Sequence, residues 1–353
     1  MKKKTTVALL FGGRSAEHEV SISSARAVAK HFDPAKFEVV PVYIDREGRW
    51  RVVSSLEEDA CRLAEGDFHD FLPWGKATTG AFQADIYFPV LHGPFGEDGT
   101  VQGLLDLADV PYVGAGVLGS AAGMDKAVMK ELFRSRSLPI VAHRVLREEE
   151  WAERGGSIRR SLKRAFKPPV FVKPANLGSS VGVTKVQTWD ALDEAAAAAF
   201  RFDPKIIVEQ GVVCREIECS VLGNAKPEAS LPGEVIPHRE FYDYADKYLD
   251  GKTEYGIPAR LSPPLVRRVR RLAVEAFLAC EASGLARVDF FLEAKTSRVY
   301  VNEINTLPGF TEISMYPKLW AASGLEFGPL LERLVELGFE RHRLRRRAVR
   351  RDL

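Results

Sequence analysis

The hydrophobic and polar positions at the start of the chain predict an α/β unit. A continuous apolar run at residues 7–11 indicates a buried strand, and two glycines end it. A helix is predicted next, because four apolar side chains recur at helical spacing: Ala25, Val28, Ala29 and Phe32. Further strands are predicted at residues 37–44 and 85–91, the second followed by a glycine-rich turn at 92–99. Both glycine-rich turns therefore lie at the carboxyl ends of strands, where open α/β sheets bind ligands.

From residue 168 onward the pattern changes to strand, glycine-rich turn and strand. The strands are predicted at residues 170–173 and 181–186, with the turn at 176–180. Lys173 ends the first strand. A glycine-rich hairpin with a lysine at its base suits a phosphate lid, because backbone amides and an ammonium group can both neutralise phosphate oxygens. The chain contains no Walker A sequence, so a different fold would have to hold a nucleotide.

Two further strands are predicted at residues 205–209 and 216–221. The second alternates cleanly, and three of its residues are expected to point inward: Ile217, Cys219 and Val221. Glu216 and Glu218 then share the other face. Their spacing alone does not separate ligands from solvated charges.

A long segment at residues 238–258 contains too many Tyr, Asp, Lys and Gly residues for a core element. Such an aromatic loop predicts a lid or a binding loop. Beyond it, a helix is predicted at residues 265–282, with four of its apolar positions at Val269, Leu272, Ala276 and Leu278.

The glycines at residues 114–119 match the GxGxxG pattern of dinucleotide-binding proteins, but the match is weak. A dinucleotide site would place an acidic residue at the end of the next strand, and residues 135–142 contain none. We interpret these glycines as a tight turn into the helix that carries Met124, Asp125 and Lys126.

The carboxyl-terminal part of the chain predicts a β-hairpin with strands at residues 286–290 and 301–305. Because side chains alternate along a strand, Glu303 and Asn305 share one face. Folding back through the turn brings Asp289 opposite either Glu303 or the residue before it.

Two carboxylates and an amide oxygen in this hairpin form a hard ligand set. Such ligands suit Mg²⁺, and no thiolate or imidazole accompanies them to favour zinc. A solvated strand face is the simpler interpretation of an isolated acidic pair. The turn at residues 306–310 favours a ligand site instead, because backbone amides at a strand end can face a ligand.

The length of 353 residues indicates two or three domains. The net charge of +2 is unevenly distributed, because residues 341–353 hold seven Arg and one Asp, and subtracting their +6 leaves the remainder near −4. Nucleic acid is therefore not the natural partner of this protein. We expect the tail to be a frayed, solvated terminus, with contact to phosphates or membrane headgroups as the alternative.

Four cysteines occur without a CxxC pair: Cys61, Cys214, Cys219 and Cys280. Free thiols in a reducing, cytoplasmic compartment are expected. The apolar stretch at residues 7–11 is too short for a signal peptide, and no segment reaches the length of a transmembrane helix, so no stable membrane association is expected.

Several motifs in order resemble the ATP-grasp superfamily, and within it the D-alanine:D-alanine ligase family. The resemblance spans nearly the whole chain up to about residue 339. The motifs are FGGRSAEHEVS (11–21), HGPFGEDGT (92–100), MDK (124–126), FVKPANLGSSVGV (171–183), EQGV with REIE (209–218), FYDYADKYL (241–249), ARVDFF (286–291) and VNEINTLPGFT (301–311).

This resemblance implies an α/β protein with a three-domain ATP-grasp fold, α+β in its ATP-binding part, which assembles as a homodimer. The implied domains are an N-terminal Rossmann-like parallel-sheet domain that binds substrate (1–122), a central domain with the phosphate-lid hairpin (123–211), and a C-terminal catalytic domain (212–353) that includes the aromatic loop 238–258 and the basic tail 341–353.

ATP and two Mg²⁺ (or Mn²⁺) ions are the implied cofactors, with ATP held between the sheets of the central and C-terminal domains. The matching metal ligands are Asp289, Glu303 and Asn305. The matching ATP-binding positions are Lys126, Lys173, Ser179, Ser180, Glu209, Gln210, Val212, Glu216 and Lys247. Gln210 stands where many relatives have Lys, which puts one adenine-side contact in doubt.

The implied reaction is carboxylate activation, in which ATP phosphorylates one D-alanine and the amine of a second displaces phosphate from the acylphosphate. The matching catalytic positions are Glu17, Ser179, Tyr248, Arg287 and Gly309, and the matching substrate-binding positions are Glu17, His92, Lys247, Arg287, Ser314 and Met315. In this scheme Glu17 holds the first ammonium group within a triad with Ser179 and Tyr248. Arg287 and the Gly309 amide bind the developing oxyanion.

Alternatives remain at this stage. His92 also fits an ordinary turn histidine. The second substrate could be D-lactate or D-serine, although a Tyr at position 248 favours an amine nucleophile. A nucleotide-binding module without turnover is a different class of protein, and the metal ligands, the lysines and Arg287 argue against it.

Overall fold

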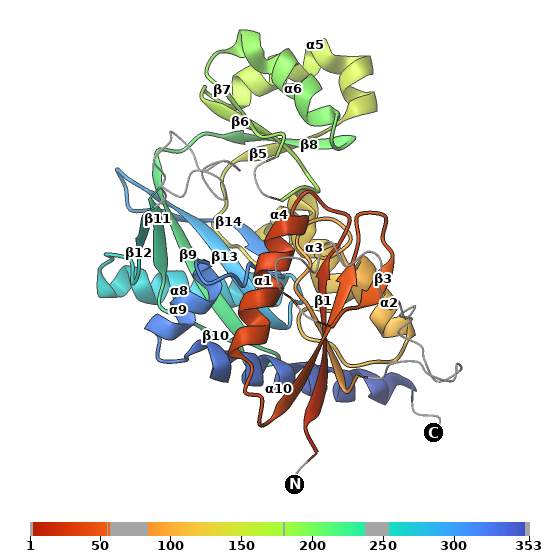
Figure 1. Cartoon of the computed structure of the whole chain (residues 1–353). Helices are drawn as coiled ribbons and strands as arrows, with labels where there is room; N and C mark the ends of the chain where they lie inside the picture. The colour runs from red at the N-terminus through yellow and green to blue at the C-terminus, as the bar shows by residue number, and fades with distance from the viewer. Residues whose placement is uncertain (1–2, 55, 57–83, 179–180, 237–253, 350–353) are drawn as a thin grey trace.

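The computed structural model describes residues 3–54, 56, 84–178, 181–236 and 254–349, which form three sheets with their covering helices (Figure 1). The first sheet has the order β3-β2-β1-β4. β1 is parallel to β2 and β4, while β3 is antiparallel to β2. These strands are β1 (Thr5–Gly12), β2 (Phe37–Ile44), β3 (Trp50–Val52) and β4 (Ile86–Pro89), and the helices beside them are α1 (His18–His31), α2 (Thr100–Leu107) and α3 (Val117–Met124). The predicted α/β opening is confirmed.

The helical spacing after β1 has the expected physical consequence. Ala25 and Val28 of α1 are fully buried, and Phe32 just beyond it is 5% exposed. They pack with Val7 and Leu9 of β1 in one hydrophobic cluster. The apolar stripe of α1 thus covers one face of the first sheet.

The second sheet is antiparallel and has the order β5-β8-β6-β7. Its elements are β5 (His143–Arg147), β6 (Val170–Pro174), β7 (Thr184–Val186) and β8 (Lys205–Gln210), with α5 (Glu148–Ala165), η2 (Trp189–Ala191) and α6 (Leu192–Phe200). Ile158 and Leu162 of α5 pack with Val170 and Val172 of β6. Figure 1 shows α5 and α6 on the far side of this sheet, which leaves its other face toward the rest of the molecule.

The third sheet has the order β12-β11-β9-β13-β14, with β10 beside β9. Its strands are β9 (Cys214–Gly223), β10 (Glu228–Ala229), β11 (Gly233–Ile236), β12 (Glu254–Gly256), β13 (Gly284–Glu293) and β14 (Val299–Asn305). The helices are α4 (Lys126–Ser135), α8 (Pro263–Ala279), α9 (Met315–Ala322) and α10 (Phe327–Arg345), followed by η3 (Arg346–Val349).

The core of the third sheet contains the three inward positions predicted in β9, each fully buried: Ile217, Cys219 and Val221. They pack against α8, which begins and ends slightly earlier than the helix predicted at 265–282. Leu278, expected among its apolar positions, is 38% exposed. The aromatic loop predicted at 238–258 lies outside the described residues up to residue 253.

The first and third sheets share one hydrophobic core. Phe310, after β14, lies 6.0 Å from Phe88 of β4, measured between ring centroids, in an edge-to-face arrangement. Leu334 of α10 belongs to the same cluster. Gly119 of α3 permits another close approach, because a Cβ there would lie 2.7 Å from the Glu281 carbonyl oxygen. The predicted tight turn into a helix at residues 114–119 is confirmed, because Gly114 has a φ of 103° and Gly116 is the N-cap of α3. The single helix predicted to carry Met124, Asp125 and Lys126 is wrong, because α3 ends at Met124 and α4 begins at Lys126, with the extended Asp125 between them.

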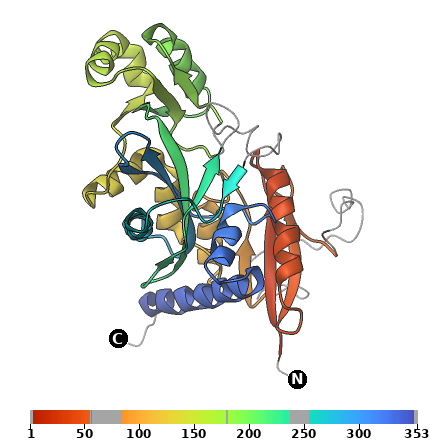
Figure 2. The same cartoon turned by 90° about the vertical axis from the view of Figure 1, so that its left-hand side faces the viewer.

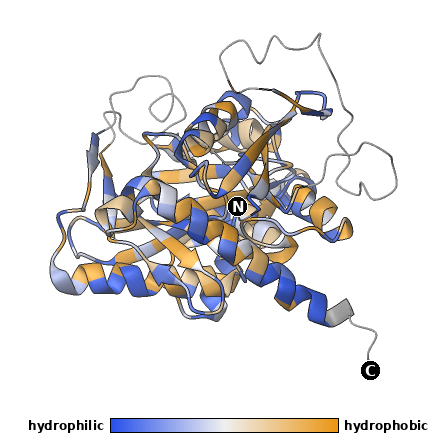
Figure 3. Ribbon diagram, turned by 60° about the horizontal axis from the view of Figure 1, so that its bottom comes forward, coloured by the Kyte–Doolittle hydropathy of each residue, from blue (hydrophilic) through white to orange (hydrophobic). Residues whose placement is uncertain are grey.

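The basic tail differs from its prediction. Instead of fraying at residue 341, the chain continues as α10 and η3 to residue 349, and hydrophilic and hydrophobic residues alternate along α10 (Figure 3). The Arg341 guanidinium lies 3.9 Å from the ring centroid of Tyr112. Arg345 pairs with Asp106, and Arg346 Nε lies 3.4 Å from Asp109 Oδ2. The expected fraying is therefore wrong for residues 341–349, which are helical and have acidic and aromatic partners near α2, whereas the expected solvent exposure is confirmed for residues 343–347.

The packing of α10 against the first sheet predicts opposite effects for one substitution at two helical glycines. A Cβ at Gly338 would lie 2.8 Å from both Ile86 Cδ1 and the Tyr112 carbonyl oxygen. Gly338→Ala should therefore lower the free energy of unfolding by about 1–3 kcal/mol. Gly156→Ala, at an exposed position of helix α5, should be neutral or stabilising, because Ala has the higher helix propensity. Thermal midpoints of the two variants would check this, and equal midpoints would contradict it.

Candidate active site

The second and third sheets are neighbours in the molecule (Figure 2), and charged side chains of both sheets and of α4 lie close together between them. This region, which includes a pocket, is called the cleft. The face of the second sheet away from α5 and α6 carries Phe171, Lys173 and Glu209. The Lys173 ammonium lies 5.9 Å from the ring centroid of Phe171 and 6.0 Å from that of Phe291, on β13 of the third sheet. Lys173 therefore stands between the two sheets.

Three carboxylates lie in one row across the third sheet. Asp289 of β13 is paired with Glu303 of β14 on one side and with Glu218 of β9 on the other. The pairing with Glu303 arises from a bulge, since Phe290 pairs with Val301 and Asn302 is passed over in the register. Of the two registers left open by the sequence, the structure has the one that places Asp289 opposite Glu303.

Arg287 lies beside this row and is held by two of its carboxylates. Its Nε and Nη2 donate to Asp289 Oδ1 and Oδ2, both at 2.7 Å, and Nε lies 3.1 Å from Glu218 Oε2. Burial of the guanidinium opposes its charge, but Asp289 and Glu218 more than compensate and hold the pKa of Arg287 well above its ordinary value. Arg287 is therefore a fixed cation, oriented by a bidentate contact.

One of the predicted phosphate-binding groups, Lys126, lies close to the acidic row. Lys126, at the start of α4, donates to the Leu177 carbonyl oxygen (2.6 Å) and lies 3.6 Å from Glu303 Oε2. It therefore connects the glycine-rich turn of the second sheet with β14.

Glu209, predicted to contact adenine, is buried between two lysines. Its Oε1 lies 2.7 Å from Lys130 Nζ, and its Oε2 lies 2.5 Å from Lys173 Nζ. Burial would favour the protonated acid, but the two ammonium groups outweigh it and keep the pKa of Glu209 well below its usual range. Glu209 is thus a permanent anion that orients Lys173.

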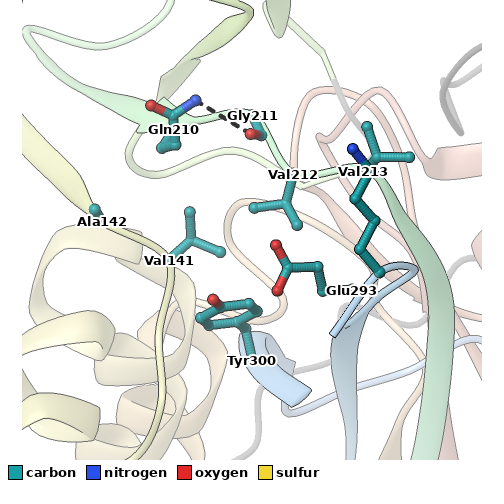
Figure 4. Close-up of a pocket in the computed structure, with 9 residues that line it drawn as sticks. Val141, Ala142, Gln210, Gly211, Val212, Val213, Glu293 and Tyr300 are labelled. Carbon is teal, nitrogen blue, oxygen red and sulfur yellow. Dashed lines mark hydrogen bonds between the residues drawn. The ribbon is translucent and has the colours of Figure 1, made fainter. Parts of the chain in front are cut away.

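A pocket of about 360 Å³ lies where the second and third sheets are joined (Figure 4). Its lining consists of Val141, Ala142, Gln210, Gly211, Val212, Val213, Glu293, Lys295 and Tyr300. It contains two residues predicted at the adenine, Gln210 and Val212. Figure 4 shows the side chains of Val141, Val212 and Tyr300 and the Glu293 carboxylate converging on its centre, so its wall combines apolar groups with a charged one.

The side chain of Gln210 forms its shortest hydrogen bonds with Lys167, which does not line the pocket. Its Nε2 donates to the Lys167 carbonyl oxygen (2.7 Å), and its Oε1 accepts from the Lys167 amide (2.9 Å). Gln210 therefore fixes the loop before β6 with its side chain, while its backbone amide donates to the Ala142 carbonyl oxygen (2.9 Å).

The turns of the first sheet bring Glu17 and His92 toward the glycine-rich turn and the end of β14. Glu17 is 8% exposed, and a Cβ at Gly178 would lie 3.6 Å from Glu17 Oε2. His92 is buried, with Nδ1 at 3.1 Å from the Leu307 carbonyl oxygen and Nε2 at 3.0 Å from Ser24 Oγ. Burial lowers the pKa of His92. His92 thus ties the first sheet to the loop after β14.

Glu97, behind His92, has a strongly perturbed acidity. Its Oε1 accepts from the Gly93 amide (2.9 Å) and lies 4.0 Å from His92 Nδ1. Burial, together with the nearby charge of Glu17, raises the pKa of Glu97 to about 8.

The loop after β14 places Gly309 beside Ser314, since a Cβ on Gly309 would lie 2.8 Å from Ser314 Oγ. Ser314 Oγ accepts from the Thr311 amide (2.9 Å). Met315 is 5% exposed and packs in the cluster that contains Val235, so its side chain belongs to the core.

The remaining predicted site residues divide into two groups. Glu216 of β9 is paired with Phe291 in the register and shares the cleft face with Glu218. Four residues lie outside the described part of the chain: Ser179, Ser180, Lys247 and Tyr248.

The donor chemistry of β13 and β14 fits a divalent metal such as Mg²⁺ or Mn²⁺. Asp289 and Glu303 supply carboxylate oxygens from paired positions, and Asn305 supplies an amide oxygen that accepts from the Leu307 amide (2.9 Å). Among residues 3–54, 56, 84–178, 181–236 and 254–349, no group of three or more His, Cys, Asp or Glu side chains is arranged to hold a metal ion.

Three charged residues of the site were not among the predicted site residues: Lys130 and Glu218 in the cleft, and Glu97 in the turn of the first sheet. Each had a weak signal in the sequence. Glu97 lies within the HGPFGEDGT motif, Lys130 follows Lys126 at helical spacing, and Glu218 alternates with buried residues of β9. None of these patterns predicts which charged residue each side chain pairs with, because the pairs form only when the sheets pack together.

Comparison with known proteins gives a consistent result. A family model described as "D-ala D-ala ligase N-terminus" matches residues 6–115, and one described as "D-ala D-ala ligase C-terminus" matches residues 132–336. D-alanine–D-alanine ligases of Geobacillus thermodenitrificans and Solibacter usitatus are 47% and 49% identical to the chain, over 96% of its length and 96% and 97% of theirs.

Solved structures show the same relationship. The D-alanine–D-alanine ligase from Coxiella burnetii superposes with a TM-score of 0.88 at 38% identity, covering 98% of this chain and 97% of that one. The VanG D-Ala:D-Ser ligase from Enterococcus faecalis superposes with a TM-score of 0.86 at 31% identity, covering 95% of this chain and all of that one. The predicted α/β, ATP-grasp architecture is confirmed by these matches. Within the described residues, no helix is both long and apolar enough to span a membrane.

The raised pKa of Glu97 predicts a specific pH dependence of stability. Between its ordinary value of 4.5 and about 8, the folded state keeps a proton on Glu97 that the unfolded state has lost. This contribution to stability is full below pH 4.5 and is lost as the pH rises through about 8. Glu97→Gln removes it, so the thermal midpoint of the variant should gain on that of the wild type as pH rises across this range.

Glu153→Gln provides the control, because it makes the same change at an exposed position of α5. Its midpoint should stay at a constant offset from the wild type. A constant offset for Glu97→Gln as well would contradict the proposed titration.

Proposed function

The chain belongs to the D-alanine–D-alanine ligase family, and on that premise we propose that it joins two molecules of D-alanine into D-alanyl-D-alanine for peptidoglycan synthesis, converting ATP to ADP and phosphate. One observation supports it above the others. The cleft opposes Lys126 and Lys173 to the acidic pair of Asp289 and Glu303, which is the charge pattern that ATP with a divalent metal requires.

ATP lies, in this proposal, between the second and third sheets. Lys126 and Lys173 bind its phosphates, the segment at Glu209, Gln210 and Val212 faces the adenine, and Glu216 binds the ribose. Since the Gln210 side chain holds Lys167, its adenine contact is a backbone contact. Ser179, Ser180 and Lys247 are proposed to add phosphate contacts.

Asp289, Glu303 and Asn305 would hold Mg²⁺ or Mn²⁺, with two ions as the proposed number. When bound, these ions screen the phosphate oxygens from the incoming carboxylate and from the amine that follows. This screening matters because two negatively charged groups must meet in the first step.

The first D-alanine is held by Glu17 through its ammonium group, which leaves its carboxylate free to attack the γ-phosphorus of ATP. The attack forms an acylphosphate and releases ADP. The amine of the second D-alanine then adds to the acyl carbon, loses a proton, and expels phosphate as the peptide bond forms. His92 lies beside this route, and Ser314 with the Met315 backbone binds the second carboxylate.

Arg287 and the Gly309 amide are proposed to bind the oxyanion that develops in the second step. Nε and Nη2 of Arg287 bond Asp289, so Nη1 is the nitrogen that would face the oxyanion. A donor already fixed in this way needs no reorganisation as charge develops. Ser179 and Tyr248 are proposed to complete a hydrogen-bond triad with Glu17.

The domain division at residues 122 and 211, a homodimeric state and a cytoplasmic location are further parts of the proposal. The three described cysteines, Cys214, Cys219 and Cys280, are free thiols, which fits a reducing compartment. Light scattering measures the oligomeric state.

A ligase that uses D-serine as second substrate is the runner-up, because the VanG D-Ala:D-Ser ligase has the same fold. Six curated relatives that are 45–49% identical are named D-alanine–D-alanine ligases, which favours D-alanine.

The purified protein should release phosphate from ATP only when both D-alanine and Mg²⁺ are present, with one D-alanyl-D-alanine formed per phosphate. Chromatography of products from mixtures of D-alanine, D-serine and D-lactate would identify the second substrate. Phosphate release without any D-amino acid would contradict the ligase assignment, and nucleotide binding without turnover would indicate a binding module.

Glu303→Gln and Asp289→Asn should each lower kcat by at least about 100-fold, because a neutral amide is a weaker ligand for a divalent metal. Both should also weaken Mn²⁺ binding, which electron paramagnetic resonance measures without turnover. Glu228→Gln, an exposed carboxylate on β10 of the same sheet, is the control and should change neither quantity. Normal Mn²⁺ affinity in both site variants would remove these residues from the metal site.

A further inference from the structure

Lys130 is a buried lysine that the proposed mechanism does not use. It lies on α4, one helical turn after Lys126, and its side chain is 2% exposed. Its Nζ lies 2.7 Å from Glu209 Oε1 and donates to the Asn302 carbonyl oxygen at 3.1 Å. An ammonium group this deeply buried is costly to the fold unless it is paired, so these two contacts define what it does.

The first contact divides one carboxylate between two cations. Glu209 Oε2 bonds Lys173 while Oε1 bonds Lys130, so this buried triad carries a net charge of +1. Without Lys130, Glu209 would have Lys173 as its only partner and would neutralise the charge of Lys173. Because Lys173 stands between the two sheets, the sharing of Glu209 decides how much of its charge is available to a phosphate.

The second contact reaches the other wall of the cleft. Asn302 is the residue passed over in the β13–β14 register, and the bulge there sets Glu303 opposite Asp289. Its carbonyl oxygen accepts from Lys130. The neighbouring Met129 Sδ accepts from the Ile304 amide at 3.2 Å, so α4 contacts the bulge from both sides.

We propose that Lys130 is a positioning residue for nucleotide phosphate binding, which shares Glu209 so that Lys173 keeps its charge for the phosphates and which holds the bulge that places Glu303. The inference rests on the proposed function, because it assumes that a nucleotide phosphate occupies the cleft. Lys130 itself touches neither substrate nor metal.

The test compares the affinities of ADP and adenosine for the wild type and for Lys130→Met by titration calorimetry. The variant should bind ADP about tenfold more weakly, while its adenosine affinity changes less than about twofold. In turnover, KM for ATP should rise and KM for D-alanine should stay unchanged. Equal losses for ADP and adenosine, or no loss for ADP, would overturn the proposal.

A second substitution tests the route through Glu209. In the double variant Lys130→Met/Glu209→Gln, the buried negative charge is removed together with the positive one, so Lys173 is no longer neutralised. Because Glu209 is itself proposed to face the adenine, the quantity compared is the ratio of ADP affinity to adenosine affinity. This ratio should recover severalfold relative to Lys130→Met, a coupling between the two sites that a purely structural role would not produce. An unchanged ratio would show that Lys130 does not act through Glu209.

Two further variants distinguish a specific loss of ADP affinity from a general loss of stability. Lys130→Gln keeps a hydrogen-bond donor for the Asn302 carbonyl oxygen but lacks the charge, so its ADP affinity should fall as in Lys130→Met. Lys205→Met removes another part-buried lysine, the partner of Asp125, and should lower the thermal midpoint without a selective loss of ADP affinity. A selective loss there would overturn the assignment to Lys130.

The binding measurements need no turnover. Failure of the wild type to form D-alanyl-D-alanine would therefore contradict the proposed function alone. A selective ADP loss in Lys130→Met would still support the positioning role at a nucleotide site.

Discussion

Mutual neutralisation of buried charges between the second and third sheets is the constraint on which the rest of the structure depends. Ammonium, guanidinium and carboxylate groups removed from water destabilise a fold unless they are paired. Glu209 is bonded by Lys130 and Lys173, and Arg287 is bonded by Asp289. Glu209, Lys130 and Lys173 come from β8, α4 and β6, whereas Arg287 and Asp289 are successive positions on one face of β13. The charges therefore determine how these elements are set relative to one another.

The same pairing suits phosphoryl and acyl transfer. ATP brings several negative charges into the cleft, and an acceptor carboxylate must approach them. Cations already held by carboxylates can bind these charges without first being ordered, which is the basis of electrostatic preorganisation. Arg287 illustrates this, because Asp289 fixes two of its nitrogens and Glu218 lies 3.1 Å from its Nε.

Apolar cores on the outer faces of both sheets offset the free-energy cost of burying charged groups in the cleft. α5 and α6 cover one sheet, and α8 covers the other. A third core joins the first sheet to α9 and α10 through Phe310, which brings Glu17 and His92 to the end of β14. Arg345 of α10 and Arg346 of η3 add to this junction, since they pair with Asp106 and Asp109.

The sequence by itself determined many of the elements of this protein and the chemical types in its site. Apolar runs and period-two or period-3.6 patterns located strands such as β1, β9 and β13 and the helices α1 and α8, because burial of one face imposes them locally, but β3, β5, α5 and α10 were not predicted. The order of motifs named Lys126, Lys173, Glu209, Arg287, Asp289 and Glu303, which the structure brings together. Only the tertiary structure decided which side chains meet. Alternation identifies which face of a strand a side chain lies on, but not the register of the strand. The bulge at Asn302 makes Glu303 the partner of Asp289, and this bulge is contacted by α4, which is far away in the sequence. The same reason applies to the partners of Lys130, Glu218 and the arginines of the tail. Opposite charges attract according to their distance in space, and the local sequence does not determine that distance.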